Sequence, residues 1–206
     1  MPAAIGQASS YKTSDNGNAK GKIMKTHAKS VFKLVSDRFG FWNEIKGVEV
    51  GVWRGDLSKS LLSRLPRLKL WMVDPWEDIE PTATMPKAGH EVTLARKNAE
   101  RIARIFGSRA IIYQMTSTEA TADFKFDDMK FDFIFIDACH LYDDVREDIE
   151  AWFPLIREGG LIMGHDYDGR GDRKKKWGVK RAVDEFAAKN DLKVGVSPGL
   201  VWSIEK

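Results

Sequence analysis

Short, unbroken apolar runs alternate along the chain with segments whose apolar residues recur every three or four positions. The unbroken runs predict buried strands at residues 46–50, 68–74, 110–115, 131–137 and 161–166. The three-to-four spacing predicts helices with one buried face at residues 31–39, 57–65, 92–106, 142–156 and 179–190. Residues 192–196 and 200–206, joined by Ser-Pro-Gly, predict a closing hairpin.

The alternation of strands with helices indicates the fold class. Strands that are apolar throughout are typical of a parallel sheet with helices on both faces. We therefore expect one α/β domain over residues 23–206, with a mostly parallel seven-stranded sheet and an antiparallel C-terminal hairpin. The polar, Gly/Ser/Asn-rich residues 1–22 predict a disordered tail.

Composition narrows the functional classes. The 206 residues, 43% of them hydrophobic, suit one domain with a full core. The single cysteine, Cys139, excludes an intrachain disulfide and favours a reducing compartment, so we expect a cytoplasmic protein. The sequence has no apolar run of the roughly 20 residues that cross a bilayer. A net charge of +3 is low for a dedicated nucleic-acid binder.

Polar and acidic residues follow every predicted parallel strand. Ligands of open parallel sheets bind at the carboxyl ends of the strands. The residues at those ends are Glu49, Gly51, Trp53 and Gly55; Asp74 and Trp76; Thr116 and Ser117; Asp137 and His140; and His165 and Asp166. Their recurrence at one edge predicts a ligand site there.

The first of these turns contains Gly51 and Gly55, four residues apart. Gly51 permits a tight turn and Gly55 lets the next helix begin close to a ligand; a plain strand-to-helix turn is the alternative. Glu49, at the end of a buried strand, needs a partner because a buried carboxylate is costly. An ammonium or sulfonium group would supply one, whereas a pyrophosphate would be repelled.

The pattern Glu49-Val-Gly51-x-x-x-Gly55, with Asp74 ending the second strand and an acid ending the fourth, resembles the class I S-adenosylmethionine-dependent methyltransferases, which have a Rossmann-like fold. The resemblance covers roughly residues 28–206. The run FIDACHLYDDVREDIEAWFPLIREGGLIMGHDY is similar to the metal-dependent sugar and macrolide O-methyltransferases. It implies S-adenosylmethionine as the cofactor and a hydroxylated small molecule as the acceptor. A homo-oligomer is an alternative to a monomer.

The resemblance also implies roles for the residues at the sheet edge. The glycine turn with Glu49 and Trp53 would line the methionine end of the cofactor, and Asp74 would accept hydrogen bonds from the ribose hydroxyls. Trp76 would pack on the sugar or adenine, with a core or lid aromatic as the alternative. Thr116 and Ser117 would lie near the adenine, although the family's usual Gly-Asp-Ser is absent there.

The same resemblance implies a metal site and a base. Asp137 would face the reacting centre as a cofactor-binding and catalytic residue. With Asp166 it would also bind Mg²⁺, but His165 stands where relatives carry a carboxylate. With His165 at that position, three alternatives stay open: a site for Mg²⁺, a site for a softer divalent metal, or no metal site. Imidazole is a suitable ligand for the softer metals. His140, with an ordinary pKa of about 6.5, would be the general base and His165 its substitute. A histidine that caps the next helix is the alternative for His140.

Other readings stay in competition. The basic residues 170–177 predict either a solvated loop or a flap that attracts an anionic acceptor. A nicotinamide-dependent oxidoreductase would require a third glycine in the first turn, and the turn lacks it. A nucleic-acid methyltransferase would require an Asn/Asp-Pro-Pro-aromatic motif in place of Asp137-Ala-Cys-His140. A non-catalytic nucleoside-binding module is the remaining alternative.

Overall fold

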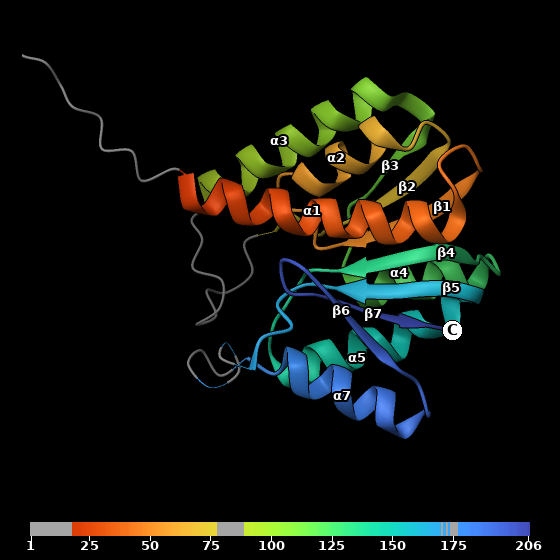
Figure 1. Cartoon of the computed structure of the whole chain (residues 1–206). Coiled ribbons are helices and arrows are strands. Elements are labelled where there is room, and N and C mark those ends of the chain that lie inside the picture. Colours follow the sequence, from red (N-terminus) through yellow and green to blue (C-terminus); the bar gives the residue numbers. More distant parts are fainter. Residues whose placement is uncertain (1–17, 78–88, 170, 172, 174–176) are drawn as a thin grey trace, which may run out of the picture.

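The protein is described by a computed structural model that covers residues 18–77, 89–169, 171, 173 and 177–206. A seven-stranded sheet runs through the centre in the order β3-β2-β1-β4-β5-β7-β6 (Figure 1). Its strands are β1 Ile45–Val50, β2 Leu68–Val73, β3 Ala110–Tyr113, β4 Phe131–Ile136, β5 Ile156–Gly164, β6 Val194–Ser197 and β7 Val201–Glu205. The predicted α/β fold with a mostly parallel sheet and a closing antiparallel hairpin is confirmed.

The register of the central strands brings the predicted site residues to one edge. Val50 of β1 pairs with Val73 of β2 and with Ile136 of β4, and all three strands run parallel. Gly164 of β5 continues the row beside Ile136. The residues that follow these strands therefore lie next to one another, at the point where the strand order reverses between β1 and β4.

Helices cover both faces of the sheet (Figure 1). Helices α1 Asn18–Phe39, α2 Asp56–Arg64 and α3 Gly89–Phe106 pack on one face, and α4 Ser117–Phe126, α5 Tyr142–Trp152 and α7 Val179–Lys189 pack on the other. Short 3₁₀ turns at Gly107–Arg109 and Phe153–Leu155 precede β3 and β5. Two apolar clusters, one on each face, form the core. None of the described helices is both long and apolar enough to span a membrane.

The predicted helix at 142–156 is too long. It ends at Trp152, because Pro154 lacks the N–H that a continuing α-helix needs and lies in the 3₁₀ turn Phe153–Leu155. Strand β5 then begins at Ile156, five residues before the predicted start, and Ile156 pairs with Phe131. The register shifts between that pair and the next, so the Gly-Gly at 159–160 lies inside an irregular strand.

Helix α4 was not predicted. Its buried residues are Ala120, Thr121 and Phe124, which make too weak an apolar stripe to stand out in the sequence. The helix begins with a capping box, in which Thr116 accepts from the Glu119 N–H and the Glu119 side chain accepts from the Thr116 N–H. The Thr-x-x-Glu spacing was the signal that could have revealed it.

The N-terminal helix is longer than its apolar pattern indicated. Helix α1 begins at Asn18, within the segment 1–22 that the sequence assigned to the tail, and ends at Phe39 as predicted. Residues 1–17 lie outside the described residues. Ser30 on this helix donates a hydrogen bond of 2.6 Å to the Pro198 carbonyl, which ties α1 to the turn between β6 and β7.

Candidate active site

A cavity of about 570 Å³ opens at the carboxyl edge of the sheet, beside β1, β2 and β4. Its volume is within the range of small-molecule sites. Seven of the predicted cofactor residues line it: Gly51, Trp53, Asp74, Trp76, Thr116, Ser117 and Asp137. The other two, Glu49 and Gly55, are not among its lining residues.

Asp74 organises the loops on the β1–β2 side of the cavity. Its two carboxylate oxygens accept the N–H groups of Trp53 and Trp76, each at 2.8 Å. The indole N–H of Trp76 donates in turn to the Trp53 carbonyl at 2.9 Å. Both tryptophans have a positive φ, 52° and 44°, which is unfavourable for such residues. The carboxylate therefore holds two strained turns that form one wall of the cavity.

The two glycines of the first turn have different structural roles. A Cβ on Gly51, whose φ is 85°, would lie 2.3 Å from the Asp137 carbonyl oxygen, so only glycine lets β1 and β4 approach so closely at their ends. Gly55, with φ 74°, caps α2, and a Cβ there would lie 2.8 Å from the side chain of Ile102 on α3. Gly55 thus serves helix packing, as in the plain-turn alternative.

Glu49 lies behind the cavity wall rather than in it. Its side chain is 3% exposed and accepts a hydrogen bond from the Ser58 hydroxyl of α2. Burial raises the pKa of Glu49 to about 8, and the bond from Ser58 only partly opposes this rise. The carboxyl group is therefore protonated at neutral pH, and its partner in the structure is a hydroxyl rather than a cation.

Sequence reasoning missed the acidic wall that α5 gives the cavity, formed by Asp144, Glu147 and Asp148. The Ser117 hydroxyl donates to Asp148 and accepts the Trp152 indole N–H at 2.8 Å. Burial raises the pKa of Asp148 to about 6. Glu147 and Asp148 follow Asp144 by three and four positions on a predicted helix. This spacing brings side chains together on a helix surface and was the signal for the acidic wall.

Cys139 also lines the cavity. Its thiol lies 2.7 Å from a carboxylate oxygen of Asp144. Burial, together with this contact, raises the pKa of the thiol to about 11. The thiol is therefore protonated at neutral pH and unsuited to act as a nucleophile.

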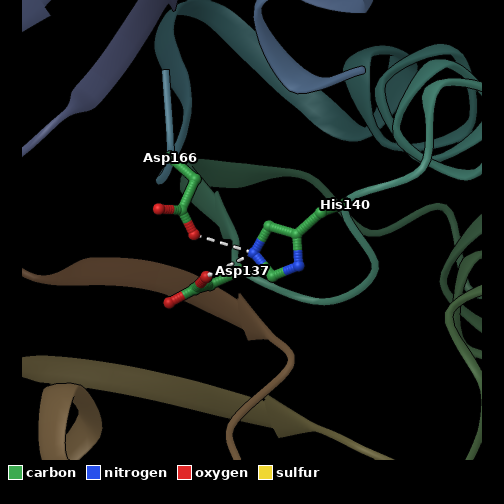
Figure 2. A group of neighbouring side chains, drawn as sticks. All are labelled: Asp137, His140 and Asp166. Atoms are coloured by element: carbon green, nitrogen blue, oxygen red, sulfur yellow. Dashed lines mark ion pairs between the residues drawn. The ribbon is translucent and has the colours of Figure 1, made fainter. Parts of the chain in front are cut away.

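A cluster of carboxylates and imidazoles lies beside the cavity, at the ends of β4 and β5. Asp137, His140 and Asp166 each offer one ligand atom, and these atoms lie within 4.8 Å of one another. Figure 2 shows both carboxylates pointing at the same ring nitrogen of His140. This Nε2 is 2.8 Å from Asp166 Oδ2 and 3.8 Å from Asp137 Oδ1. The cluster shares Asp137 with the cavity.

His165 joins the same cluster. Its Nδ1 lies 3.3 Å from Asp166 Oδ2 and 3.7 Å from Asp137 Oδ1. Sequence reasoning missed His27 of α1, whose ring centroid is 4.5 Å from that of His165 and whose side chain is 4% exposed. His27 precedes the predicted helix at residues 31–39, and nothing in the local sequence indicates a site residue there. Only the packing of α1 onto the sheet brings it to this edge.

Charge pairing controls the protonation of the cluster. Burial disfavours the imidazolium form, but the carboxylates of Asp137 and Asp166 outweigh it and raise the pKa of His140 to about 9 and of His165 to about 10. The imidazoles in turn hold the pKa of both aspartates below the ordinary value, against the opposing effect of burial. While it is paired in this way, His140 keeps its proton at neutral pH and is a poor general base.

An aromatic ring packs against this cluster. Trp177 stacks on His140, with ring centroids 4.5 Å apart and planes 21° apart. The next residue, Gly178, donates its N–H to the His140 carbonyl at 2.8 Å and caps α7. Residues 170, 172 and 174–176 of the basic segment, predicted to be a solvated loop or a flap, lie outside the described residues.

Comparison with known proteins identifies the family. A family model described as a methyltransferase domain matches residues 48–167, more than half of the chain. The chain belongs to this methyltransferase family. The predicted class I S-adenosylmethionine-dependent methyltransferase is thereby confirmed, and the oxidoreductase alternative is not supported. A search of curated proteins gives no match.

Solved structures share the fold at low sequence identity. The methyltransferase is similar to an O-methyltransferase from Bacillus cereus in complex with SAH (TM-score 0.62, 18% identity, 87% of this chain and 80% of that one). It is also similar to the O-methyltransferase TomG from Streptomyces achromogenes in complex with SAM (TM-score 0.61, 17%, 86% and 78%). A third, MycE in complex with Mg and SAH, aligns with 95% of this chain but 49% of its own (TM-score 0.55, 17%).

Proposed function

We propose that this methyltransferase transfers the methyl group of S-adenosylmethionine to a hydroxyl of a small molecule, assisted by a divalent metal ion. One observation carries the proposal: Asp137 lines the 570 Å³ cavity and also belongs to the carboxylate–imidazole cluster. A methyl donor in the cavity would therefore meet a group able to orient and activate an acceptor. Two of the similar structures, from Bacillus cereus and Streptomyces achromogenes, are O-methyltransferases, which supports oxygen as the acceptor atom.

The β1–β2 side of the cavity suits the nucleoside. Asp74 would accept hydrogen bonds from the ribose hydroxyls, and the rings of Trp53 and Trp76 would form the adjoining wall. Gly51 would let the methionine end approach the β1 backbone, and the buried pair Glu49–Ser58 would support this wall from behind. The carboxyl groups around the cavity would also favour the positive charge of the sulfonium.

The cluster suits a divalent cation. Although His140 Nε2 is 2.8 Å from Asp166, neither ring nitrogen of His140 makes a directional hydrogen bond within the described part of the chain. Nitrogen and oxygen atoms this close, yet not aligned as hydrogen bonds, suit ligands that share one metal ion. Asp137, His140 and Asp166 would hold the ion, which when bound would lower the pKa of an acceptor hydroxyl.

The protein's own residues would align the reaction. Methyl transfer is an in-line displacement, so the main tasks are to position the acceptor oxygen and to take up its proton. Asp137 would orient the hydroxyl because it faces both the cavity and the cluster. His140, held by Asp166 and covered by Trp177, would fix one side of the acceptor pocket, and its role as general base remains a prediction.

Calorimetric titration with S-adenosylhomocysteine tests the cofactor half of the proposal. We expect micromolar binding that weakens in Asp74→Asn. A screen of hydroxylated acceptors, including anionic and sugar-containing ones, with radiolabelled S-adenosylmethionine and added divalent metal then tests transfer. No binding of the nucleoside would overturn the proposal. Binding without transfer to any acceptor would favour the non-catalytic module.

A further inference from the structure

The cluster contains a second imidazole nitrogen that a magnesium site does not need. His165 Nδ1 and His140 Nε2 both face the same two oxygens, Asp137 Oδ1 and Asp166 Oδ2. We propose that these four residues form one site with two nitrogen and two oxygen ligands, which selects a divalent transition metal such as zinc or iron over Mg²⁺. The inference builds on the proposed function, but its test measures metal binding by itself.

The distances within the cluster suit one shared ion. Metal–nitrogen and metal–oxygen bonds of about 2.1 Å place neighbouring ligand atoms about 3.0 Å apart in an octahedron and about 3.4 Å apart in a tetrahedron. The four nitrogen–oxygen separations are 2.8, 3.3, 3.7 and 3.8 Å. They fall on both sides of those values. Asp137, His140 and Asp166 already have ligand atoms within 4.8 Å of one another, and a movement of the His165 ring towards His140 would complete the set of four.

The chemistry of the donors decides which ion. Mg²⁺ takes oxygen ligands in an octahedron and keeps several waters, whereas imidazole suits zinc, iron, nickel and copper. A carboxylate at position 165 would give the oxygen-rich set that the sequence resemblance implied. With His165 in that position, half of the protein ligands are nitrogen. A histidine instead of a carboxylate at position 165 therefore changes the preferred metal but not the location of the site.

His27 supports the orientation of His165. Its buried ring contacts the rings of Phe135 and His165, at centroid distances of 6.2 Å and 4.5 Å. A Cβ on Gly199 would lie 2.7 Å from the backbone nitrogen of His27, so the β6–β7 turn packs directly against α1 at this point. His27 is thus packed against the His165 ring, with the two planes 53° apart, and would restrict the rotation that turns Nδ1 away from the carboxylates. We assign His27 as a positioning residue.

Extended X-ray absorption of the zinc-loaded enzyme tests the ligand set. We expect two imidazoles per zinc in the wild type and one in His165→Glu. Affinity alone is a weaker test, because zinc binds more tightly than magnesium at most sites. The ratio of zinc to magnesium affinity, measured by titration of the metal-stripped protein, should nevertheless fall at least 10-fold in His165→Glu. The exposed carboxylate variant Asp143→Asn is the control and should change neither value.

His27→Phe tests the positioning role. We expect zinc or cobalt to bind 5-fold to 10-fold more weakly, with a changed visible spectrum of the cobalt form. A residue that only fills the core would lower the melting temperature and leave that spectrum as in the wild type, which would overturn the assignment of His27. Circular dichroism identifies a variant that fails to fold, and His27→Asn, a smaller polar replacement, then provides the same comparison.

Titration with S-adenosylhomocysteine in parallel separates the two proposals. One imidazole or none at the zinc of the wild type, or no zinc binding below about 1 mM, would overturn the four-ligand site even if the nucleoside binds. Two imidazoles at the zinc without nucleoside binding would uphold the site and overturn the proposed methyl transfer.

Discussion

The carboxyl edge of the sheet has two halves that are built in different ways. Around β1 and β2, the backbone supplies the contacts: the N–H groups of Trp53 and Trp76 converge on the single carboxylate of Asp74. Around β4 and β5, side chains supply them: the imidazoles of His140 and His165 face the carboxylates of Asp137 and Asp166. We refer to them as the backbone half and the side-chain half.

The difference has a chemical consequence. Backbone N–H groups have fixed positions and do not titrate, so the backbone half suits constant recognition of one ligand. The side-chain half consists of carboxylates and imidazoles, which can bind either a proton or a metal ion. Recognition of the cofactor and activation of the acceptor should therefore be separable by mutation. Asp137, the residue common to the cavity and the cluster, joins the two halves.

The largest expected effect comes from Asp166→Asn, in the side-chain half. Asp166 has φ 58°, a conformation that asparagine tolerates well, so the fold should persist. Loss of the charge that faces both imidazoles should lower methyl transfer roughly 1000-fold, equivalent to about 4 kcal/mol. Affinity for S-adenosylhomocysteine should stay within a factor of about three. An equal loss of both properties would show that the two halves are not independent.

Glu49→Gln tests the buried carboxyl group that belongs to neither half. The pKa of Glu49 is raised from 4.5 to about 8, so the folded protein binds a proton that the unfolded chain releases above pH 4.5. Its contribution to stability is complete below that value and is lost as the pH rises towards 8. Relative to Glu49→Gln, the wild type should lose about 3 kcal/mol between pH 5 and pH 7.

Urea unfolding at several pH values measures this difference. Glu44→Gln is the control, because Glu44 is 80% exposed and its ion pair with Arg67 lies on the surface. A constant stability difference between the wild type and Glu49→Gln would mean that Glu49 is ionised in the folded protein. That result would restore the cationic partner that the sequence implied for it.

Asp74→Asn is the matching change in the backbone half. An asparagine has one acceptor oxygen, so its NH₂ group would face either the Trp53 or the Trp76 N–H and leave it without an acceptor. We expect the affinity for S-adenosylhomocysteine to fall roughly 50-fold, while turnover at saturating S-adenosylmethionine falls less than about 5-fold. Asp128→Asn, at an exposed aspartate that does not line the cavity, is the control. Loss of turnover with unchanged affinity would contradict the comparison.

The two halves were also unequal in how far the sequence revealed them. Gly51 and Asp74 follow predicted strands directly, so the register of a parallel sheet was enough to bring them together. In the side-chain half, Asp137, His140 and Asp166 were found in the same way. The contact between His27 and His165 depends on the docking of α1, to which no local pattern points.

Burial explains the other differences from the sequence. Glu49 was expected to face a cation, but its side chain enters the core and meets Ser58, nine residues further along the chain. Sequence spacing gives the strand on which a side chain lies, and only packing gives the partner that it meets. The same limit applies to His140, whose pKa is set by carboxylates on two different strand ends.

The smallest expected effect comes from Thr116→Ala, at the start of the unpredicted helix α4. The Thr116 hydroxyl accepts the Glu119 N–H in the capping box, and removal of such a cap costs about 1 kcal/mol. Thr116→Ser keeps the hydroxyl and should restore the wild-type stability in urea unfolding. Because Ser117 and Thr118 of the same turn line the cavity, fraying of α4 should weaken S-adenosylhomocysteine binding about 2-fold to 3-fold and leave zinc binding unchanged. An equal effect of the alanine and serine variants would show that the hydroxyl cap does not hold this part of the cavity wall.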